Sequence, residues 1–520
     1  MAATASCDVV IVGSGSSGAV VARRLVDAGA NVVLLEAGGP DDNPVIHDPN
    51  GVWDLWDGPE DWGYRTVPQA GCAGRRLHLP RGKVLGGSSS LNGMIYIRGH
   101  RSDYDTWAYL GNAGWSHEEV LPLFKRSEDF DRGPSEYHGS GGPMRVITDY
   151  EPHPLIAAAV AASHEAGVPL NPDHNGPGLD GVGLAQLTIR DGVRESTATA
   201  FLRDVAGSEN LALLTGARAR RLLFDGARCS GVEVVQDGAM ESILAEHEVV
   251  VCCGTIESPK LLMLSGIGDG EELRALGIEV RAHLPGVGKN LHDHALSPVV
   301  FAAARPVPPP IPGLQLLHGH LFARSRAGLV APDIQPLFFH VPAYLEEAGM
   351  TGPPDGFTLM GGIIRPAARG SIRLASADLD EPPLVDPAYM SRDADLDAMV
   401  TALELCREIG RQPALAEWTA QELYPGPDVR TRDELREYVR RTTITYHHQV
   451  GTCRMGVDEL AVVDPELRVY GAEGLRVADA SVMPLVTSGN THAPAVMIGE
   501  RAAELVIRKL ASKHEEALHA

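Results

Sequence analysis

A glycine-rich turn close to the N-terminus is the feature that most constrains the fold of this chain. An apolar run at residues 7–12 leads into residues 13–18, whose glycines have the spacing GxGxxG, and residues 19–28 have the pattern of a helix. A second apolar run, residues 31–35, is followed by Glu36. A strand, a glycine-rich turn, a helix, a strand and an acid in this order are typical of a unit that binds an adenine dinucleotide. The pattern predicts such a site and fits NAD and FAD equally well.

Each position of the motif has a physical task. Gly13 permits the tight turn, Gly15 lets the backbone approach a pyrophosphate, and Gly18 lets the helix pack close to the strand. The pyrophosphate would lie at the positive end of that helix, and Glu36 would accept hydrogen bonds from the adenosine ribose. A βαβ turn without a ligand is the alternative. We assign three flanking residues to the same site: Ser16, Ser17 and Ala37.

Composition bounds the kind of protein. A length of 520 residues predicts two to four structural units. The 45 basic and 68 acidic residues give a net charge of −23, which argues against binding to nucleic acid or to anionic membranes. The acidic excess would suit a cationic substrate, although solubility explains it as well. No apolar run approaches the ~20 residues of a membrane span. We see no secretory signal and no metal-binding cysteine spacing, so we expect a cytoplasmic protein.

The middle of the chain divides into segments of different character. Residues 40–100 form a long stretch rich in Gly, Pro and Trp, which we interpret as a lid. Short strands are expected between residues 210 and 255, and mainly strands between 315 and 390. The proline-rich residues 305–312 mark a boundary or a surface loop. A long helix is expected at residues 493–510.

Two further glycine-rich segments carry more information. Residues 81–93 contain too few apolar positions for a core element, and their glycines let backbone N–H groups approach a flat or anionic ligand. Residues 253–268 predict the end of a strand, a turn, a short helix with Pro259 in its first turn, and a glycine stop.

With these segments in view, the chain resembles the glucose–methanol–choline (GMC) family of flavin oxidoreductases. Residues 81–93 and 253–268 resemble the two signature patterns of that family, and residues 103–107, residues 284–291 and the C-terminal stretch also match, so the resemblance covers nearly the whole chain. It implies FAD rather than NAD. It also implies an α/β fold, α+β overall, in which a Rossmann-like FAD-binding domain is joined to a substrate domain built on a mostly antiparallel sheet.

The resemblance implies three regions that are discontinuous in sequence. The FAD-binding domain would comprise residues 1–50, 195–295 and 455–520. A lid and FAD-covering segment would comprise residues 51–149. The substrate-binding domain would comprise residues 150–194 and 296–454.

Two histidines are implied as catalytic. Counted back from the motif at residues 452–456, His448 falls on the catalytic histidine of the family, and His492 falls on its second catalytic position. Oxidising an alcohol needs a base for the hydroxyl proton and a second donor for the developing alkoxide, which suits such a pair. His447 is the alternative base if the register slips by one residue. We assign no metal, although His292 and His294 flank an aspartate.

The remaining cofactor contacts also come from the resemblance. Asp479 is implied near the ribityl or pyrophosphate part of FAD, with a helix-capping role as the alternative. Some family members bind FAD covalently through a histidine at the position of Leu91, so the leucine predicts non-covalent FAD. The other implied FAD-binding residues are Arg81, Val84, Gly86, Gly87, Ser88, Asn92, Gly93, Met94, Ala480, Asn490 and Thr491.

The expected reaction is oxidation of a primary or secondary alcohol to a carbonyl, with hydride transfer to flavin N5. The substrate could be a sugar, an aminosugar, a polyol, an aryl alcohol or a choline-like alcohol. The electron acceptor could be oxygen, as in an oxidase, or another acceptor, as in a dehydrogenase. A hydroxynitrile lyase with redox-silent FAD and a non-catalytic NAD-binding protein are the alternatives. The sequence does not predict an oligomeric state.

Overall fold

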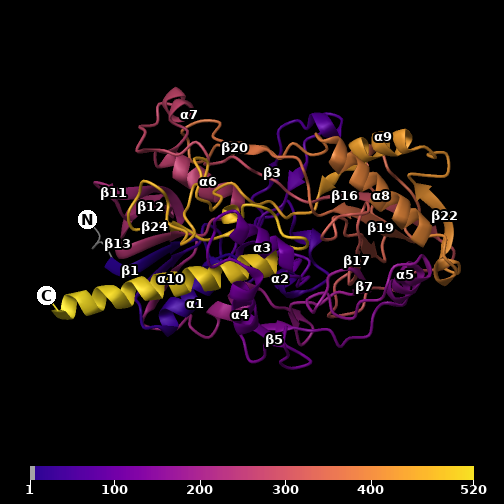
Figure 1. The fold of residues 1–520 in the computed structure, drawn as a ribbon, viewed down its shortest axis with the longest axis horizontal. Helices are drawn as coiled ribbons and strands as arrows, with labels where there is room; N and C mark the ends of the chain where they lie inside the picture. The colour runs from indigo at the N-terminus through magenta and orange to yellow at the C-terminus, as the bar shows by residue number, and fades with distance from the viewer. Residues whose placement is uncertain (1–5, 520) are drawn as a thin grey trace.

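The computed structural model describes residues 6–519 and the side chains of residues 7–512. One half of the molecule is built on a seven-stranded sheet (Figure 1). Its strand order is β10 (Leu211–Leu214), β2 (Val32–Leu35), β1 (Ser6–Val12), β13 (Ala239–Val251), β12 (Arg228–Gln236) and β11 (Arg218–Asp225), with β24 (Leu475–Val477) also paired to β13. The pairs β10–β2, β2–β1, β1–β13 and β13–β24 are parallel, whereas β13–β12 and β12–β11 are antiparallel.

The apolar runs form this sheet because both of its faces are covered. Val9, Val10 and Ile11 of β1 are completely buried, as is typical of a parallel strand between helical layers. The helix after the glycine-rich turn, α1 (Gly18–Asp27), packs against the long C-terminal helix α10 (His492–His519), and α10 packs against α4 (His117–Ser127). The strands β1, β10, β11 and β12 and the helix α1 agree with the sequence prediction, whereas β13 is longer than the short strand expected there and α10 extends beyond residue 510.

The other half is built on a second sheet of seven strands that is antiparallel throughout. Its order is β22 (Thr419–Tyr424), β16 (Ala295–Ala303), β19 (Gly356–Ile363), β18 (Leu337–Phe339), β17 (Gly319–Phe322) and β7 (Gly181–Leu184), with β23 (Ile444–Thr445) also paired to β16. The helices α5 (Pro154–Glu165), α8 (Asp393–Ile409) and α9 (Arg432–Thr442) pack on this sheet (Figure 1).

The segment predicted as an irregular lid contains short elements between its loops. They are α2 (Pro44–His47), η1 (Trp53–Leu55), β3 (Tyr64–Arg65), η2 (Ala70–Cys72), β4 (His78–Leu79) and η3 (Gly87–Ser90). The other described elements are α3 (Arg101–Tyr109), β5 (Glu128–Phe130), β6 (Met144–Val146), β8 (Ile189–Arg190), β9 (Val193–Arg194), η4 (Ala198–Leu202), α6 (Gly254–Leu264), β14 (Ile267–Gly268), α7 (Gly270–Ala275), β15 (Ala282–His283), η5 (Glu346–Ala348), β20 (Ser371–Arg373), β21 (Leu384–Asp386), η6 (Pro413–Leu415) and η7 (Ala480–Val482).

The helix α6 begins earlier than predicted. Instead of a turn followed by a short helix, the chain is helical from Gly254, and Pro259 lies inside the helix rather than at its start. The reason is a long-range cap, because the Asp479 carboxylate accepts the Gly254 N–H at 2.9 Å. A carboxylate more than two hundred residues away therefore fixes where this helix starts.

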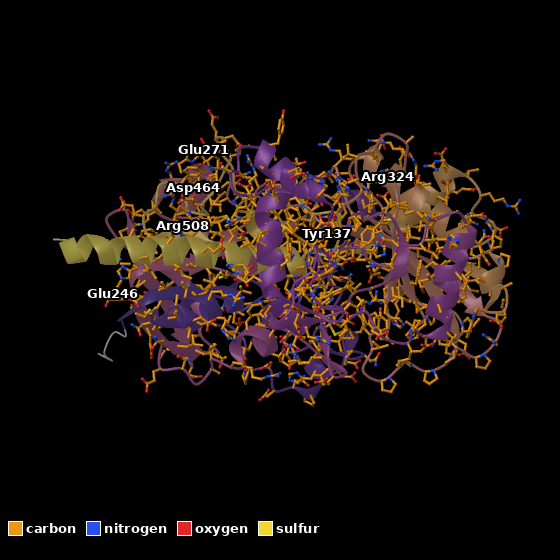
Figure 2. All side chains as sticks on the ribbon, turned by 60° about the horizontal axis from the view of Figure 1, so that its bottom comes forward. Tyr137, Glu246, Glu271, Arg324, Asp464 and Arg508 are labelled. Atoms are coloured by element: carbon orange, nitrogen blue, oxygen red, sulfur yellow. The ribbon has the colours of Figure 1, made fainter. Side chains whose placement is uncertain are left out.

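Side chains fill the interior between the ribbons (Figure 2). The labelled Arg508 on α10 and Arg324 beyond the second sheet are both exposed (Figure 2). Among the helices of the described residues, none combines the length and the apolar character needed to span a membrane. The boundaries predicted for the FAD-binding domain, the lid and the substrate-binding domain stay a prediction.

Candidate active site

A cavity of about 660 Å³ reaches from the first sheet to the second. It brings together most of the residues predicted for the site: Gly13, Gly15, Ser16, Ser17, Glu36, Ala37, Arg81, Gly87, Ser88, Asn92, Gly93, Met94, His448, Asp479, Ala480, Asn490, Thr491 and His492. Gly18, Val84 and Gly86 do not line it. Residues from the first 40 positions and from the last 50 share one wall, since β1 and β24 both pair with β13.

The three predicted residues outside the cavity support it from behind. A Cβ on Gly18 would lie 1.9 Å from the Gly13 carbonyl oxygen, so the glycine permits α1 to pack on the turn. Val84 is buried in a small apolar cluster with Leu55. The Gly86 N–H donates to Ser14 Oγ at 3.3 Å and ties the second glycine-rich segment to the first.

The two glycine-rich segments meet where a dinucleotide is expected. Gly15 and Gly87 both line the cavity, and a Cβ on Gly87 would lie only 2.7 Å from Gly15 Cα. Gly87 also has a φ of +54°, a conformation that other residues rarely adopt. Any side chain at this point would push the segments apart.

Glu36 is held in a fixed orientation at the edge of the cavity. Its Oε2 accepts from the Ser14 N–H at 3.1 Å and from the Ser14 hydroxyl at 2.7 Å, and Oε1 accepts from the Gly38 N–H at 2.9 Å. Burial raises the pKa of Glu36, while these hydrogen bonds favour its charged form. The role of Ser14 was missed in the sequence, where it is only a spacer between two glycines.

Asp479 makes both kinds of contact considered for it in the sequence. It lines the cavity two residues after the end of β24. Its carboxylate also caps two helices, because Oδ1 accepts the Ser481 N–H at 2.8 Å and Oδ2 accepts the Gly254 N–H and, at 2.6 Å, the Ser258 hydroxyl. The capping role is therefore present in the structure.

His448 lies at the centre of a line of polar side chains. Its Nε2 is 3.2 Å from Asn490 Nδ2, and its Nδ1 is 2.9 Å from His294 Nδ1. Asn490 Oδ1 in turn accepts from Gln335 Nε2 at 3.1 Å. His294 and Gln335 were not predicted for the site; His294 stood out only as part of a possible metal motif.

Asp293 fixes the backbone beneath His448. Its carboxylate accepts the His448 N–H at 2.7 Å, the Thr445 hydroxyl at 2.6 Å and Gln449 Nε2 at 2.6 Å, and the Tyr389 hydroxyl also donates to it. The aspartate between the two histidines thus holds the loop that carries the predicted base. No spacing in the sequence indicates this contact, because it joins segments about 150 residues apart.

His447, the neighbour of His448, points to different partners. Its ring packs against Trp56 with centroids 4.9 Å apart, and its carbonyl oxygen accepts from Arg81 Nη2 at 2.6 Å. Its φ is +69°, an uncommon value for a non-glycine residue. This turn of the backbone directs the two adjacent histidines to separate parts of the cavity, and it is His448 that contacts Asn490.

His492 begins α10 and faces the same cavity. Its Nδ1 is 2.9 Å from Ser16 Oγ, whereas its Nε2 is buried without a hydrogen-bond partner among the described residues. Burial, with a smaller contribution from Arg194, lowers the pKa of His492 to about 4. Burial likewise holds the pKa of His448 well below 6.5. Both rings are therefore neutral near neutral pH, as a proton acceptor has to be.

Comparison with known proteins identifies the family. Two family models, both described as GMC oxidoreductase, match residues 7–296 and 366–499. The oxygen-dependent choline dehydrogenase of Rhizobium johnstonii is 39% identical over 536 residues, which cover 98% of this chain and 97% of that protein. The mitochondrial choline dehydrogenase of Homo sapiens is 39% identical over 530 residues, which cover 96% of this chain and 89% of that protein.

A solved structure supports the same family assignment. The crystal structure of pyridoxine 4-oxidase from Mesorbium loti has a TM-score of 0.92 and 39% identity, and the match covers 96% of this chain and 98% of the other. The expected α/β fold, with a Rossmann-like domain and a second domain on an antiparallel sheet, is confirmed. The chain belongs to the GMC oxidoreductase family and is an FAD-dependent oxidoreductase that acts on CH–OH groups.

Proposed function

We propose that the chain oxidises an alcohol to a carbonyl with His448 as the base and His492 as the hydrogen-bonding partner of the substrate oxygen. The observation that carries this proposal is that two buried, neutral histidines from distant segments line one cavity. Bound FAD supplies the acceptor for the hydride. A residue of the chain has to accept the proton of the hydroxyl.

The hydrogen-bond line supports a specific tautomer of His448. Asn490 Oδ1 accepts from Gln335, so the Asn490 amide donates to His448 Nε2 and this nitrogen carries a lone pair. The proton of the neutral ring then lies on Nδ1 and is donated to His294 Nδ1. His294 Nε2 is buried without a hydrogen-bond partner among the described residues, so the Nδ1 contact with His448 is the hydrogen bond that this ring makes there.

This arrangement leaves Nε2 of His448 unprotonated, and a substrate hydroxyl can bond to it once it displaces the Asn490 amide. When the substrate hydroxyl approaches Nε2, its proton moves to His448 as the hydride leaves the carbon. The imidazolium so formed keeps its Nδ1–H bond to His294, which favours the charged ring. His294 is thus a positioning residue, because it acts through His448.

His492 is oriented for the complementary task. If the Ser16 hydroxyl donates to Nδ1, the ring proton lies on Nε2, which is the nitrogen without a protein partner. A buried donor of this kind stabilises negative charge as it develops on the substrate oxygen. The two histidines would therefore hold one oxygen atom from two sides.

The residues of the cavity fit FAD. The close approach of Gly15 and Gly87 leaves backbone rather than side chains at the cavity wall, which suits a pyrophosphate. Glu36 presents its carboxyl group in a fixed orientation suited to ribose hydroxyls, and the predicted FAD-binding residues would contact the rest of the cofactor. Leu91 lines the cavity and has no nucleophilic atom, so we propose that FAD is bound without a covalent link at this residue.

Three finer points belong to the same proposal. We assign the FAD-binding region, the lid and the substrate region to the domain ranges predicted from the sequence, and we place the protein in the cytoplasm. The acceptor that reoxidises the flavin is oxygen or another acceptor.

Anaerobic mixing of the FAD-loaded protein with a panel of alcohols tests this function. Bleaching of the flavin band near 450 nm by at least one alcohol supports it. A flavin that stays oxidised with every alcohol contradicts it. Admitting air after bleaching then separates the acceptors, because an oxidase forms peroxide as the flavin band returns, whereas a dehydrogenase needs an added acceptor.

A further inference from the structure

The end of the cavity that lies against the second sheet differs chemically from the rest. We call it the apolar arm and define it by Trp53, Trp56, Leu296, Leu337, Phe339 and Met360, all of which line the cavity. The last four lie on the neighbouring strands β16, β18 and β19. Leu296 follows His294 by two residues, so the arm begins next to the partner of His448.

Aromatic rings connect the arm to His447, the neighbour of the predicted base. The Trp53 ring centroid lies 6.1 Å from that of Phe339 and 6.4 Å from that of Trp56, and Trp56 lies 4.9 Å from His447. Rings at these separations form a continuous apolar surface that a substrate body can contact. Contact between such a surface and an apolar group favours binding. The surface offers few hydrogen-bond partners to the several hydroxyls of a polyol or sugar.

The acidic side chains that line the cavity lie elsewhere. Among the described residues they are Glu36, Glu257 and Asp479. Glu36 follows β2, Asp479 follows β24, and Glu257 on α6 accepts from the Tyr64 hydroxyl at 2.5 Å, so all three belong to the first sheet and its helix. The described strands of the second sheet contribute no acidic side chain to the cavity wall.

A cation in the arm would therefore lack a counter-charge. Aromatic faces attract quaternary ammonium groups, but burying a cation without an opposite charge loses its hydration. Arg81, which lines the cavity and donates to the His447 carbonyl oxygen, adds a positive charge on that side. The missing counter-charge and the nearby positive charge disfavour a choline-like substrate, even though relatives 38–39% identical to this chain are choline dehydrogenases.

Resting on the function proposed above, we infer that the substrate is an uncharged alcohol whose body is apolar or aromatic. The apolar arm receives the body, and His448 and His492 receive the hydroxyl. The oxidation follows the reaction already described: the alcohol loses a hydride to FAD and a proton to His448. Charged aminosugars, choline and polyols are poor substrates on this basis.

A pair of alcohols of the same shape tests the inference. Choline and 3,3-dimethylbutan-1-ol differ in one atom, a positively charged nitrogen against a neutral carbon. We expect kcat/KM for flavin reduction to be at least about tenfold higher for 3,3-dimethylbutan-1-ol than for choline, and benzyl alcohol to exceed sorbitol by a similar factor. Choline that is equal to or better than its neutral isostere overturns the inference.

Binding without turnover separates this inference from the proposed function. The same pair is titrated into the oxidised FAD-loaded His448→Ala variant, and the change in the flavin spectrum is followed. Tighter binding of the neutral alcohol supports the inference even if no alcohol reduces the flavin, an outcome that would overturn only the proposed function. Tighter binding of choline overturns the inference directly.

A substitution in the arm tests the cause. Leu296 is buried on β16, and Leu296→Glu would place a carboxylate in the arm, whereas Leu296→Gln has a similar shape without the charge. We expect the ratio of choline to 3,3-dimethylbutan-1-ol activity to rise by about tenfold in the glutamate variant and to change little in the glutamine variant. An unchanged ratio in a folded, FAD-loaded glutamate variant overturns the explanation, and if that variant does not fold, the wild-type pair decides.

Discussion

The Nδ1 atoms of His294 and His448 lie 2.9 Å apart in the interior of the molecule. One ring comes from the loop before β16 and the other from the loop after β23, and both are buried. Two neutral imidazoles at this distance share one proton, so each fixes the tautomer of the other. With the Asn490 amide donating to His448 Nε2, the shared proton lies on His448 Nδ1, and His294 holds it there without having to touch the substrate.

Substitution of His294 tests this relationship. The Asn side chain places an oxygen close to the position of Nδ1 and keeps an acceptor for His448, whereas Leu has a similar size and no acceptor. We expect His294→Leu to lower the rate of flavin reduction by about 10–100-fold with little change in KM, and His294→Asn to retain most of the rate. Equal rates in the two variants would contradict the positioning role.

A second buried histidine serves as the control for that experiment. His340 follows β18, is buried, and has no hydrogen-bond partner on either ring nitrogen among the described residues. His340→Leu removes a buried ring without disturbing the His448 line. A rate loss in His340→Leu as large as that in His294→Leu would indicate a general effect on folding.

The pH profile reports the protonation state of the base. Burial, followed by the charges of His294, His447 and Arg81, lowers the pKa of His448 well below 6.5. A base works in its neutral form, which is populated above its pKa, so kcat/KM should stay high down to pH 6 and fall only at lower pH. Flavin content measured at each pH controls for loss of cofactor. An acid limb at pH 7 or above would contradict a buried neutral base.

The contact between Gly15 and Gly87 predicts an effect on cofactor affinity. Gly87→Ala would place a Cβ 2.7 Å from Gly15 Cα at a positive φ, so the two cofactor-binding segments must separate. We expect the Kd for FAD to rise by about tenfold or more. The variant should then retain less flavin per protein after gel filtration. Gly39→Ala is the matched control, because no atom lies within 4 Å of its Cβ position. Full retention of FAD by the Gly87 variant would contradict the close approach at the pyrophosphate site.

The mode of FAD attachment has a direct readout. Because Leu91 cannot form a bond to the flavin, precipitation with acid should release the yellow colour into the supernatant. The absorbance of the supernatant near 450 nm, compared with that of the native protein, gives the released fraction. A yellow pellet would show a covalent link through another side chain.

The sequence predicted the parts of the site that lie in local motifs. The glycines at residues 13–18, Glu36, and the histidines His448 and His492 all occur in recognisable segments, and the structure brings them to one cavity. The β1 and β13 strands were predicted for a similar reason, since continuous apolar runs mark strands buried on both faces.

The remaining features depend on contacts between distant segments. Asp293 binds the loop of His448 across 155 positions, and Asp479 caps α6 across 225 positions. Each contact exists because antiparallel pairing or a shared neighbouring strand brings the two segments together, and one sequence holds no spacing rule for it. The apolar arm was missed for a related reason, because its strands are buried on both faces and alternation does not reveal which side chains face the cavity.

The most direct test of the proposed chemistry compares the two adjacent histidines. Anaerobic stopped-flow reduction of bound FAD by 3,3-dimethylbutan-1-ol, or by the best alcohol of the panel, is measured in the wild type, His448→Ala and His447→Ala. We expect His448→Ala to keep its FAD and lose about 10²–10⁴-fold in rate, with a much smaller loss in His447→Ala. A His448→Ala variant that reduces its flavin at the wild-type rate would contradict the assignment of the base.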